Sequence, residues 1–400
     1  MGGVGDDGGA RTRPEGACAE DRAARILLGR WSEGGDPRLG ARIARAGAPA
    51  AAVEILRGAS PLANSGDLAT RLPRGFPDRG FTGSLEELVN DDLSRSERLG
   101  ARFVAPGDAE WPTQLDDLGV RAPLGLWLAG GGSLRLLAVR SIAVVGARAA
   151  TSYGEGIART LAAECAARGW CVVSGGAFGI DAAAHRGVLG IEGATVCVLA
   201  CGVDVAYPRS HVSLLEAIRQ SGLLVSEAPF GAAAMRQRFL TRNRIIAALT
   251  RGTVVVEAAL RSGSRTTARE AADLNRHVMA VPGPVTSPMS SGCHALLREG
   301  AAALVTTAED VLDLVGDIGG RVPSPLSGGG DAPPPAPAAS ALGPREARVL
   351  DAVPLRRAAP LASLARVAGI APTDVLVALG ILEASGRVRR LPDGWVRAAA

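Results

Sequence analysis

Seven short apolar runs alternate with amphipathic stretches between residues 141 and 316, and this alternation restricts the fold more than any other feature. Continuous apolar runs of this length are typical of strands that are buried on both faces. Buried strands separated by helices predict a parallel sheet that is covered by helices on both sides. The predicted strands are Ile142–Val145, Cys171–Val173, Thr195–Leu199, Leu223–Ser226, Val254–Val256, Val278–Val281 and Ala303–Val305.

The fold class that follows is α/β, with a Rossmann-like, doubly wound and mostly parallel sheet. The intervening helices are expected near 153–168, 181–190, 209–221, 239–250, 263–274, 291–299 and 308–315. Ligands of such sheets bind at the carboxyl ends of the strands, so the loops that follow the strands are the candidate site.

The remaining chain divides into shorter parts. Residues 1–20 contain few apolar residues and are expected to be disordered, and 21–102 has helical patterning. Residues 103–130 are expected to form a connector that packs onto the domain over 103–316. The Pro/Gly-rich segment 317–342 is typical of a linker. Residues 343–400 predict a small winged-helix domain, with a helix over 373–385 and a hairpin that turns at 392–394.

The 44 basic residues are all arginine, because the sequence contains no lysine. A Walker-type phosphate loop and a Schiff-base lysine are therefore excluded. The net charge of +4 is too small to indicate nucleic acid by itself, so local clustering has to decide. The 6 cysteines form no C-x-x-C pair and the 4 histidines are scattered, so no metal site is expected.

Membrane and export signals are not expected either. No stretch reaches the ~18 continuous apolar residues of a membrane span. The first residues lack the apolar segment of a signal peptide. We therefore expect a cytoplasmic protein with no membrane partner.

A glycine-rich loop lies within Trp170–His185, which reads W-C-V-V-S-G-G-A-F-G-I-D-A-A-A-H. A predicted strand runs into Ser174-Gly175-Gly176, and Gly179 precedes an Ala-rich helix that begins at Asp181. Glycines between a strand and a helix N-terminus leave backbone N–H groups free to face an anion, and the helix dipole favours negative charge there. A tight turn that needs glycine for steric reasons explains this loop equally well.

An arginine-rich helix start follows a neighbouring strand. Residues 228–256 contain five arginines and no acid, including Arg242-Asn243-Arg244. Arginine in the first turn of a helix is unfavourable by roughly a few tenths of a kcal/mol, because the dipole is already positive there. An anion from outside would relieve this cost, which favours a binding site over a solvated basic surface.

Two other loops complete the predicted edge. Arg148 follows Val145-Gly146, but the spacing lacks the Gly-x-Gly-x-x-Gly pattern, so a dinucleotide cofactor is poorly supported. Ser262-Gly263-Ser264 opens a helix that includes Thr267, and small hydroxyl residues at a helix start suit phosphate oxygens. A plain helix cap is the simpler explanation for this loop alone.

Catalysis is weakly supported. Asp181 and Glu257 are the carboxylates nearest the predicted site, and His185 lies one helical turn after Asp181. Capping by Asp181 and packing by His185 explain these residues without chemistry, and no activated nucleophile is visible. The competing class is an enzyme like the nucleoside-monophosphate phosphoribohydrolases, whose phosphate loop the Ser262–Thr267 stretch distantly resembles.

Taken together, the motifs resemble those of the DNA-processing protein A (DprA/Smf) family over roughly 105–310. The matching segments include Val145-Gly146-x-Arg148, Ser174–Asp181, Tyr207-Pro208, Phe239-x-x-Arg242-Asn243-Arg244 and Ser262-Gly263-Ser264-x-x-Thr267. So many motifs in the same order are far beyond chance. One departure is Arg265, which replaces an apolar residue and is in a position to add a phosphate contact.

The resemblance implies a non-catalytic protein without a cofactor or metal. Members bind and protect incoming single-stranded DNA, form homodimers and load the RecA recombinase during natural transformation and homologous recombination. It also implies that 21–102 is a domain of the sterile-alpha-motif or helix-hairpin-helix type. The DNA-binding residues that it implies are Arg148, Ser174, Gly175, Gly176, Gly179, Arg238, Arg242, Asn243, Arg244, Ser262, Gly263, Ser264 and Thr267.

Two features qualify how DNA would be bound. Aromatic residues make up 3% of the chain, so Phe178 and Phe239 are the plausible base platforms near the site, and either is equally consistent with core packing. The predicted helix 373–385 contains Asp374 and Glu383 and no arginine. Because major-groove readers need donors on this helix, a protein contact is favoured over base readout.

Overall fold

The computed structural model describes residues 19–56, 85–316, 344–354, 358–368, 370–391 and 393–398. The chain divides into two compact units, Met1–Arg321 and Val322–Ala400. The predicted linker 317–342 lies outside the described residues, as does the predicted disordered N-terminus except for residues 19 and 20, which begin the first helix.

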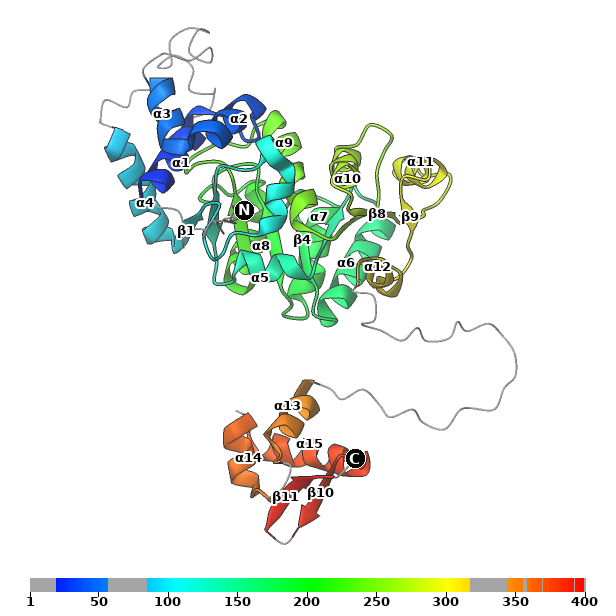
Figure 1. Ribbon diagram of the computed structural model, residues 1–400. Helices are drawn as coiled ribbons and strands as arrows, with labels where there is room; N and C mark the ends of the chain where they lie inside the picture. The colour runs from blue at the N-terminus through cyan, green and yellow to red at the C-terminus, as the bar shows by residue number, and fades with distance from the viewer. Residues whose placement is uncertain are drawn as a thin grey trace, which may run out of the picture. The chain divides into compact units, whose positions relative to one another are not determined.

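A nine-stranded sheet forms the centre of the first unit (Figure 1), in the order β1-β2-β6-β5-β4-β3-β7-β8-β9. All of its pairs are parallel except β1 with β2 and β2 with β6, so the predicted α/β class with a mostly parallel sheet is confirmed. The strands are β1 (Ala101–Val104), β2 (Leu126–Ala129), β3 (Ser141–Val145), β4 (Cys171–Ser174), β5 (Thr195–Val198), β6 (Leu223–Ser226), β7 (Gly252–Val255), β8 (His277–Ala280) and β9 (Ala303–Leu304).

The order of the parallel strands reverses at β3. From β3 the chain proceeds outward through β4, β5 and β6, and then returns to place β7 on the other side of β3, followed by β8 and β9. In the register, Ile142 lies beside Val172 on one side and beside Gly252 on the other. Sheets of this type bind ligands in the crevice beyond the carboxyl ends of the strands at such a reversal. The loops after β3, β4 and β7 therefore have the position of a binding site.

The segment 103–130 differs from its prediction. It was expected to be a connector, but it contributes β2 and half of β1, which extend the sheet in antiparallel fashion at one edge. The 3₁₀ helix η2 (Thr113–Arg121) joins them, and α5 (Leu134–Val139) leads into β3. Pro112 and Gly119 interrupt the sequence between the two strands, and no amphipathic helix separates them, which concealed the strand pattern.

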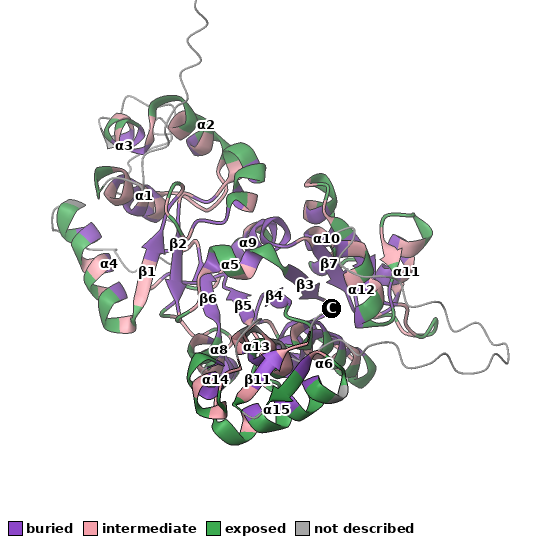
Figure 2. Cartoon of the chain, turned by 60° about the horizontal axis from the view of Figure 1, so that its bottom comes forward, coloured by how far each residue is buried: buried purple, intermediate pink, exposed green. Residues whose placement is uncertain are grey.

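Helices cover both faces of the sheet. They are α6 (Ser152–Ala167), α7 (Ile180–Leu189), α8 (Val212–Ser221), α9 (Arg236–Leu249), α10 (Ser264–Asp273), α11 (Ser291–Arg298) and α12 (Ala308–Val315), with the 3₁₀ turn η3 (Arg209–His211) before α8. Ile142 and Val144 of β3 pack with α6, α7 and α12, whereas Ala143 and Val145 pack with α9, α10 and α11. Figure 2 shows the central strands buried and the outer sides of the helices exposed.

Among the described residues, four helices precede the sheet: α1 (Ala19–Trp31), α2 (Pro37–Ala46), α3 (Ala48–Leu56) and α4 (Leu85–Leu99). They lie at the β1 end of the sheet (Figure 1). Asp36 begins α2 by accepting a hydrogen bond from the Arg38 N–H at 2.9 Å, with Pro37 in the first turn. A buried ion pair joins α1 to α4, in which Arg30 Nε lies 2.7 Å from Asp92 Oδ2.

The second unit contains α13 (Pro344–Ala352), α14 (Leu361–Ala368), α15 (Pro372–Ala384) and the antiparallel pair β10 (Val388–Leu391) and β11 (Gly394–Arg397). Val349, Leu364, Leu379 and Trp395 belong to its separate core. The expected helix and hairpin are both present, while the expected turn residue Pro392 lies outside the described residues. No single described helix is long and apolar enough to cross a membrane, and the bent pair α14 and α15 passes by length and composition alone.

Candidate functional site

An open pocket of about 690 Å³ lies at the carboxyl ends of β3, β4 and β7. Its walls come from the loops after these strands and from the starts of α9 and α10. The pocket is lined by residues that include Gly146, Arg148, Ala177, Asp181, Tyr207, Arg236, Phe239, Arg242, Asn243, Arg261, Ser262, Gly263, Ser264, Thr266 and Thr267. A volume of this size accommodates a segment of a charged chain rather than one small ion.

Three exposed arginines surround this pocket, and we call them the rim arginines: Arg148, Arg236 and Arg261. None of the three forms an ion pair with any residue in the described part of the chain. Arg148 instead lies over the ring of Phe239, with its guanidinium carbon 4.3 Å from the ring centroid. The positive charges of the rim are therefore available to an external anion.

The N-terminus of α10 forms one wall of the pocket. Gly263 precedes the helix, and no acidic residue occurs in its first turn. The hydroxyls of Ser262 and Ser264 lie 2.7 Å apart, and the Asn243 side chain ties the loop to α9 by donating to the Gly263 carbonyl at 3.3 Å. The positive end of a helix dipole and small hydroxyl side chains thus face the same space as the rim arginines.

The glycine-rich loop already holds a carboxyl group of this chain. Gly176 and Gly179 adopt positive φ angles of 70° and 71°, which favour glycine. The Ala177 N–H donates to Asp181 Oδ2 at 3.3 Å, and Ser174 is buried and donates its hydroxyl to the Val144 carbonyl at 2.6 Å. The expectation that the free N–H groups of this loop face an external anion is therefore not met at Ala177.

Arg242 lies beneath the same loop. It is 6% exposed, and its Nη1 donates to the Gly175 carbonyl at 2.7 Å and to the Val198 carbonyl. Burial raises the pKa of Asp181, and the nearby Arg242 charge opposes this shift. Burial likewise lowers the pKa of Arg242. This arginine lines the pocket, but its hydrogen bonds hold backbone carbonyls in place.

His185 completes this buried cluster. Burial lowers its pKa to about 3, and the charge of Arg242 acts in the same direction. Its Nδ1 lies 2.8 Å from the Thr195 hydroxyl, and its Nε2 has no partner among the described residues. The imidazole is therefore neutral at physiological pH. We call Asp181, His185 and Arg242 the inner cluster.

The remaining arginines of α9 are neutralised within the chain. Arg244 is 2% exposed and pairs with Glu227 through contacts of 2.7 and 2.9 Å. Arg238 is 6% exposed and pairs with Glu33 through two contacts of 3.0 Å. Two carboxylates from distant segments thus supply the counter-charge that the sequence interpretation assigned to an external anion. Neither arginine lines the pocket.

Both carboxylate oxygens of Glu257 also accept hydrogen bonds within the chain. It is buried and accepts hydrogen bonds from the Thr151 N–H at 2.9 Å and the Thr151 hydroxyl at 2.6 Å. These bonds fix the start of α6 beside the end of β7. Glu257 has the geometry of a structural carboxylate, and it does not line the pocket.

Metal and thiol chemistry find no support at this site. No group of three or more histidine, cysteine or acidic residues among the described ones could hold a metal ion. Burial raises the pKa of the thiols of Cys165, Cys171, Cys201 and Cys293 to about 12, which keeps them protonated.

The structure places the predicted residues in three groups. Arg148, Arg242, Asn243, Ser262, Gly263, Ser264 and Thr267 line the pocket. Gly175 and Gly176 line a smaller neighbouring pocket together with Phe178 and Tyr207. Ser174, Gly179, Arg238 and Arg244 lie outside both.

Among the residues that line the pocket, Arg236, Arg261 and Tyr207 do not belong to the DNA-binding set that the resemblance implies. Arg236 is one of the five arginines of residues 228–256, and no local signal separates it from Arg238, whose partner Glu33 is 205 positions away. Arg261 directly precedes the serine loop, which was a usable signal. Tyr207 is 43% exposed, and its ring centroid lies 5.6 Å from that of Phe239.

Comparison with known proteins identifies the family. A family model described as DNA recombination-mediator protein A matches residues 102–316, which is more than half of the chain. The chain belongs to this family. The resemblance that the motifs indicated is thereby confirmed.

Curated relatives match along most of the chain. A DNA processing protein DprA of Mycobacterium tuberculosis is 47% identical over 326 residues, covering 78% of this chain and 82% of that protein. Protein Smf of Escherichia coli is 38% identical over 273 residues, covering 66% and 70%. The X-ray structure of DNA processing protein A from Streptococcus pneumoniae superposes with a TM-score of 0.55 at 29% identity, covering 74% of this chain and 97% of that one.

Proposed function

We propose that this chain binds single-stranded DNA in the pocket beyond β3, β4 and β7, and that it does so without catalysis. The observation that carries the proposal is the set of three rim arginines, which form no ion pair within the described residues and surround a pocket that has the N-terminus of α10 as one wall. Arginine charges and helix N-termini together are the usual contacts to phosphate oxygens. Membership in a family of recombination mediators is consistent with a DNA ligand.

A single strand fits better than a duplex. Proteins that bind single strands combine a basic groove with aromatic faces on which bases stack. Tyr207 and Phe239 lie side by side in this pocket, and Arg148 lies over Phe239. We expect binding that depends on the DNA backbone, tolerates sequence and weakens steeply with salt.

The proposed contacts differ from the set that the resemblance implied. Phosphate contacts are assigned to the rim arginines and to Ser262, Gly263, Ser264 and Thr267. Arg242 and Asn243 hold the loops that form the walls, and Ser174, Gly175, Gly176 and Gly179 shape the glycine-rich loop. Arg238 and Arg244 act inside the chain, through their carboxylate partners.

The wider roles rest on the family resemblance. We propose that the protein acts in the cytoplasm as a homodimer, protects incoming single strands and loads RecA onto them. We retain 21–102, 103–316 and 343–400 as domains, the first of the sterile-alpha-motif or helix-hairpin-helix type and the last a winged helix. In the last, α15 exposes Leu376, Val377 and Ile381, which supports a contact with protein rather than DNA.

Fluorescence anisotropy with labelled oligothymidine and with a duplex, across a salt series, tests the proposal. The variant Arg148→Gln/Arg236→Gln/Arg261→Gln should lower the affinity for the single strand and reduce the salt slope by about 2, at about 0.7 for each lost phosphate contact. The wild type should prefer the single strand.

The control for this experiment is Arg159→Gln/Arg186→Gln/Arg298→Gln, which removes the same charge from exposed positions outside the pocket. It should bind nearly as the wild type does. Equal losses in both triple variants would show that only net charge matters, and unchanged affinity of the rim variant at low salt would remove the site assignment.

A further inference from the structure

The N-terminus of α9 carries positive charge without compensation from its own sequence. Arg236 and Arg238 both occur in its first turn, which contains no acidic residue. Met235 precedes the helix, and no side chain caps it. Two arginines therefore add to the positive end of the helix dipole, which destabilises this turn. The same turn presents Arg236 to the pocket.

A carboxylate from the N-terminal helices supplies the missing charge. Glu33, in the turn between α1 and α2, accepts hydrogen bonds from Nε and Nη2 of Arg238, each at 3.0 Å. The third nitrogen of Arg238, Nη1, donates to the Ala233 carbonyl at 2.8 Å. Glu33 thus fixes a guanidinium that also ties the segment before α9 to its first turn.

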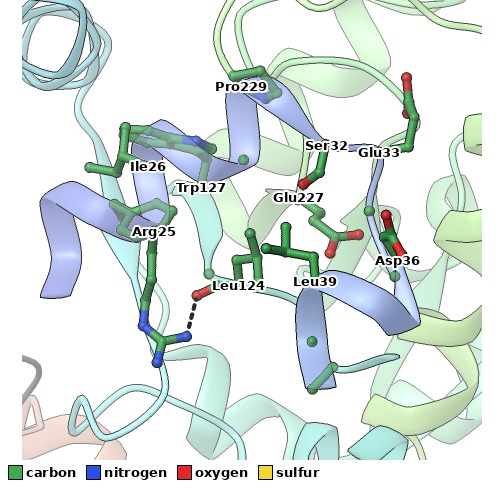
Figure 3. Close-up of a pocket in the computed structure, with 17 residues that line it drawn as sticks. Arg25, Ile26, Ser32, Glu33, Asp36, Leu39, Leu124, Trp127, Glu227 and Pro229 are labelled. Carbon is green, nitrogen blue, oxygen red and sulfur yellow. Dashed lines mark hydrogen bonds between the residues drawn. The ribbon is translucent and has the colours of Figure 1, made fainter. Parts of the chain in front are cut away.

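The turn that carries Glu33 packs tightly against Glu227 and Arg244. A Cβ atom on Gly34 would lie 2.0 Å from Glu227 Oε2. Gly35 has a φ of +73°, and a Cβ atom there would lie 2.7 Å from Arg244 Nε. Figure 3 shows Glu227 pointing toward the turn that bears Ser32, Glu33 and Asp36. Such close approach leaves the backbone of the turn little room to shift, so the position of Glu33 is well defined.

From these contacts we infer that Glu33 is a positioning residue for the DNA site. Its charge holds the first turn of α9 through Arg238. That turn places Arg236 at the rim of the pocket. The inference rests on the proposed function, because it concerns how one of the rim arginines is presented to DNA. It also gives the N-terminal helices a direct role in the site.

A purely electrostatic effect of Glu33 would change the affinity for DNA in the opposite direction. A negative charge near a basic pocket repels DNA, so its removal would strengthen binding if Glu33 acted through the electrostatic field alone. If Glu33 positions Arg236, its removal weakens binding although the protein becomes more positive. The direction of the change therefore separates the two effects.

The test compares Glu33→Gln with the wild type by anisotropy with labelled oligothymidine across a salt series. We expect affinity to fall by about fivefold, the upper range for a charge at a helix N-terminus. The salt slope should fall by about 0.7, because one phosphate contact is lost. Glu54→Gln is the matched control, since Glu54 pairs with Arg42 at 3.1 Å among the same helices.

Two further variants keep the test independent of folding defects. In an Arg236→Gln background, Glu33→Gln should have no additional effect on affinity or on the salt slope, which a general loss of structure would not reproduce. The charge exchange Glu33→Arg/Arg238→Glu should restore most of the affinity that Glu33→Gln loses.

Each outcome decides between the two proposals. If Arg236→Gln weakens binding while Glu33→Gln leaves it unchanged, strengthens it or adds to the effect of Arg236→Gln, the positioning role is wrong and the DNA site stands. If the rim triple variant and Glu33→Gln both bind as the wild type does, the proposed function itself fails.

Discussion

Arg242 of the inner cluster and the rim arginines are the same type of residue but have different roles. Arg242 lies beneath the glycine-rich loop with its Nη1 engaged by the carbonyls of Gly175 and Val198. Arg236 lies two positions before the buried Arg238, yet neither it nor Arg148 forms an ion pair in the described part of the chain. Acceptors within reach therefore decide whether an arginine of this pocket stabilises the fold or remains free for a ligand.

We expect substitutions in the inner cluster to affect mainly the stability of the fold, and substitutions at the rim to affect mainly the affinity for DNA. Substitutions in the inner cluster should lower the free energy of unfolding, and their effect on binding should follow from the disturbed loop. Substitutions at the rim should leave the free energy of unfolding within about 0.5 kcal/mol, because these side chains are exposed and unpaired.

The largest effect is expected for Arg242→Met. The substitution leaves the buried carbonyls of Gly175 and Val198 without their donor, and each buried acceptor left unsatisfied costs about 1–3 kcal/mol. Urea unfolding followed by circular dichroism measures the loss. The matched variant Arg236→Met should unfold nearly as the wild type does.

Two outcomes would contradict this difference between Arg242 and the rim arginines. If Arg242→Met and Arg236→Met changed the free energy of unfolding equally, burial and hydrogen bonding would not distinguish the two groups. If Arg242→Met kept full stability but lost DNA binding, Arg242 would be a contact residue rather than a support for the loop.

The next effect concerns pH and His185. The unfolded chain takes up a proton on this histidine below about pH 6.5, whereas the folded protein does so only near the lowered pKa of about 3. The unfolded state therefore binds more protons as the pH falls through this window, and folding is destabilised. From pH 7 to pH 5 this term amounts to about 2 kcal/mol.

Comparison with His185→Gln isolates this term. The raised pKa of Asp181 acts with the opposite sign, because the folded state then binds the extra proton, but it is present in both proteins. The stability of the wild type relative to the variant should therefore fall by about 2 kcal/mol between pH 7 and pH 5. A constant difference over this range would mean that His185 is hydrated or charged in the folded protein.

Much of the fold was predictable from the sequence, because each parallel strand is a local apolar run. The two antiparallel strands at the edge were missed because no amphipathic helix separates them, only the 3₁₀ helix η2, so they lack the strand–helix alternation that identifies the others. The loops of the site were also predictable, since strand ends share one edge of the sheet.

The different roles of these arginines could not be predicted from the sequence. Arg238 and Arg244 belong to the same helix as Arg236, and local composition treats them alike. Their roles differ because Glu33 lies 205 positions from Arg238, while Glu227 lies only 17 positions from Arg244 but on another element. Counter-charges brought by the fold are invisible to a short window along the chain.

The smallest effect is expected for Arg265→Gln, which tests how sharply the rim is defined. Arg265 was considered as an additional phosphate contact, but its Nη1 donates to the Leu260 carbonyl at 2.8 Å and its Nη2 lies 3.7 Å from Glu299. It does not line the pocket, and its partly exposed ion pair contributes about 0–1 kcal/mol. The salt slope of binding should therefore stay unchanged in Arg265→Gln, whereas Arg261→Gln, four positions earlier, should reduce it by about 0.7. Equal reductions in both variants would extend the rim along the outer face of α10 and weaken the distinction between paired and unpaired arginines.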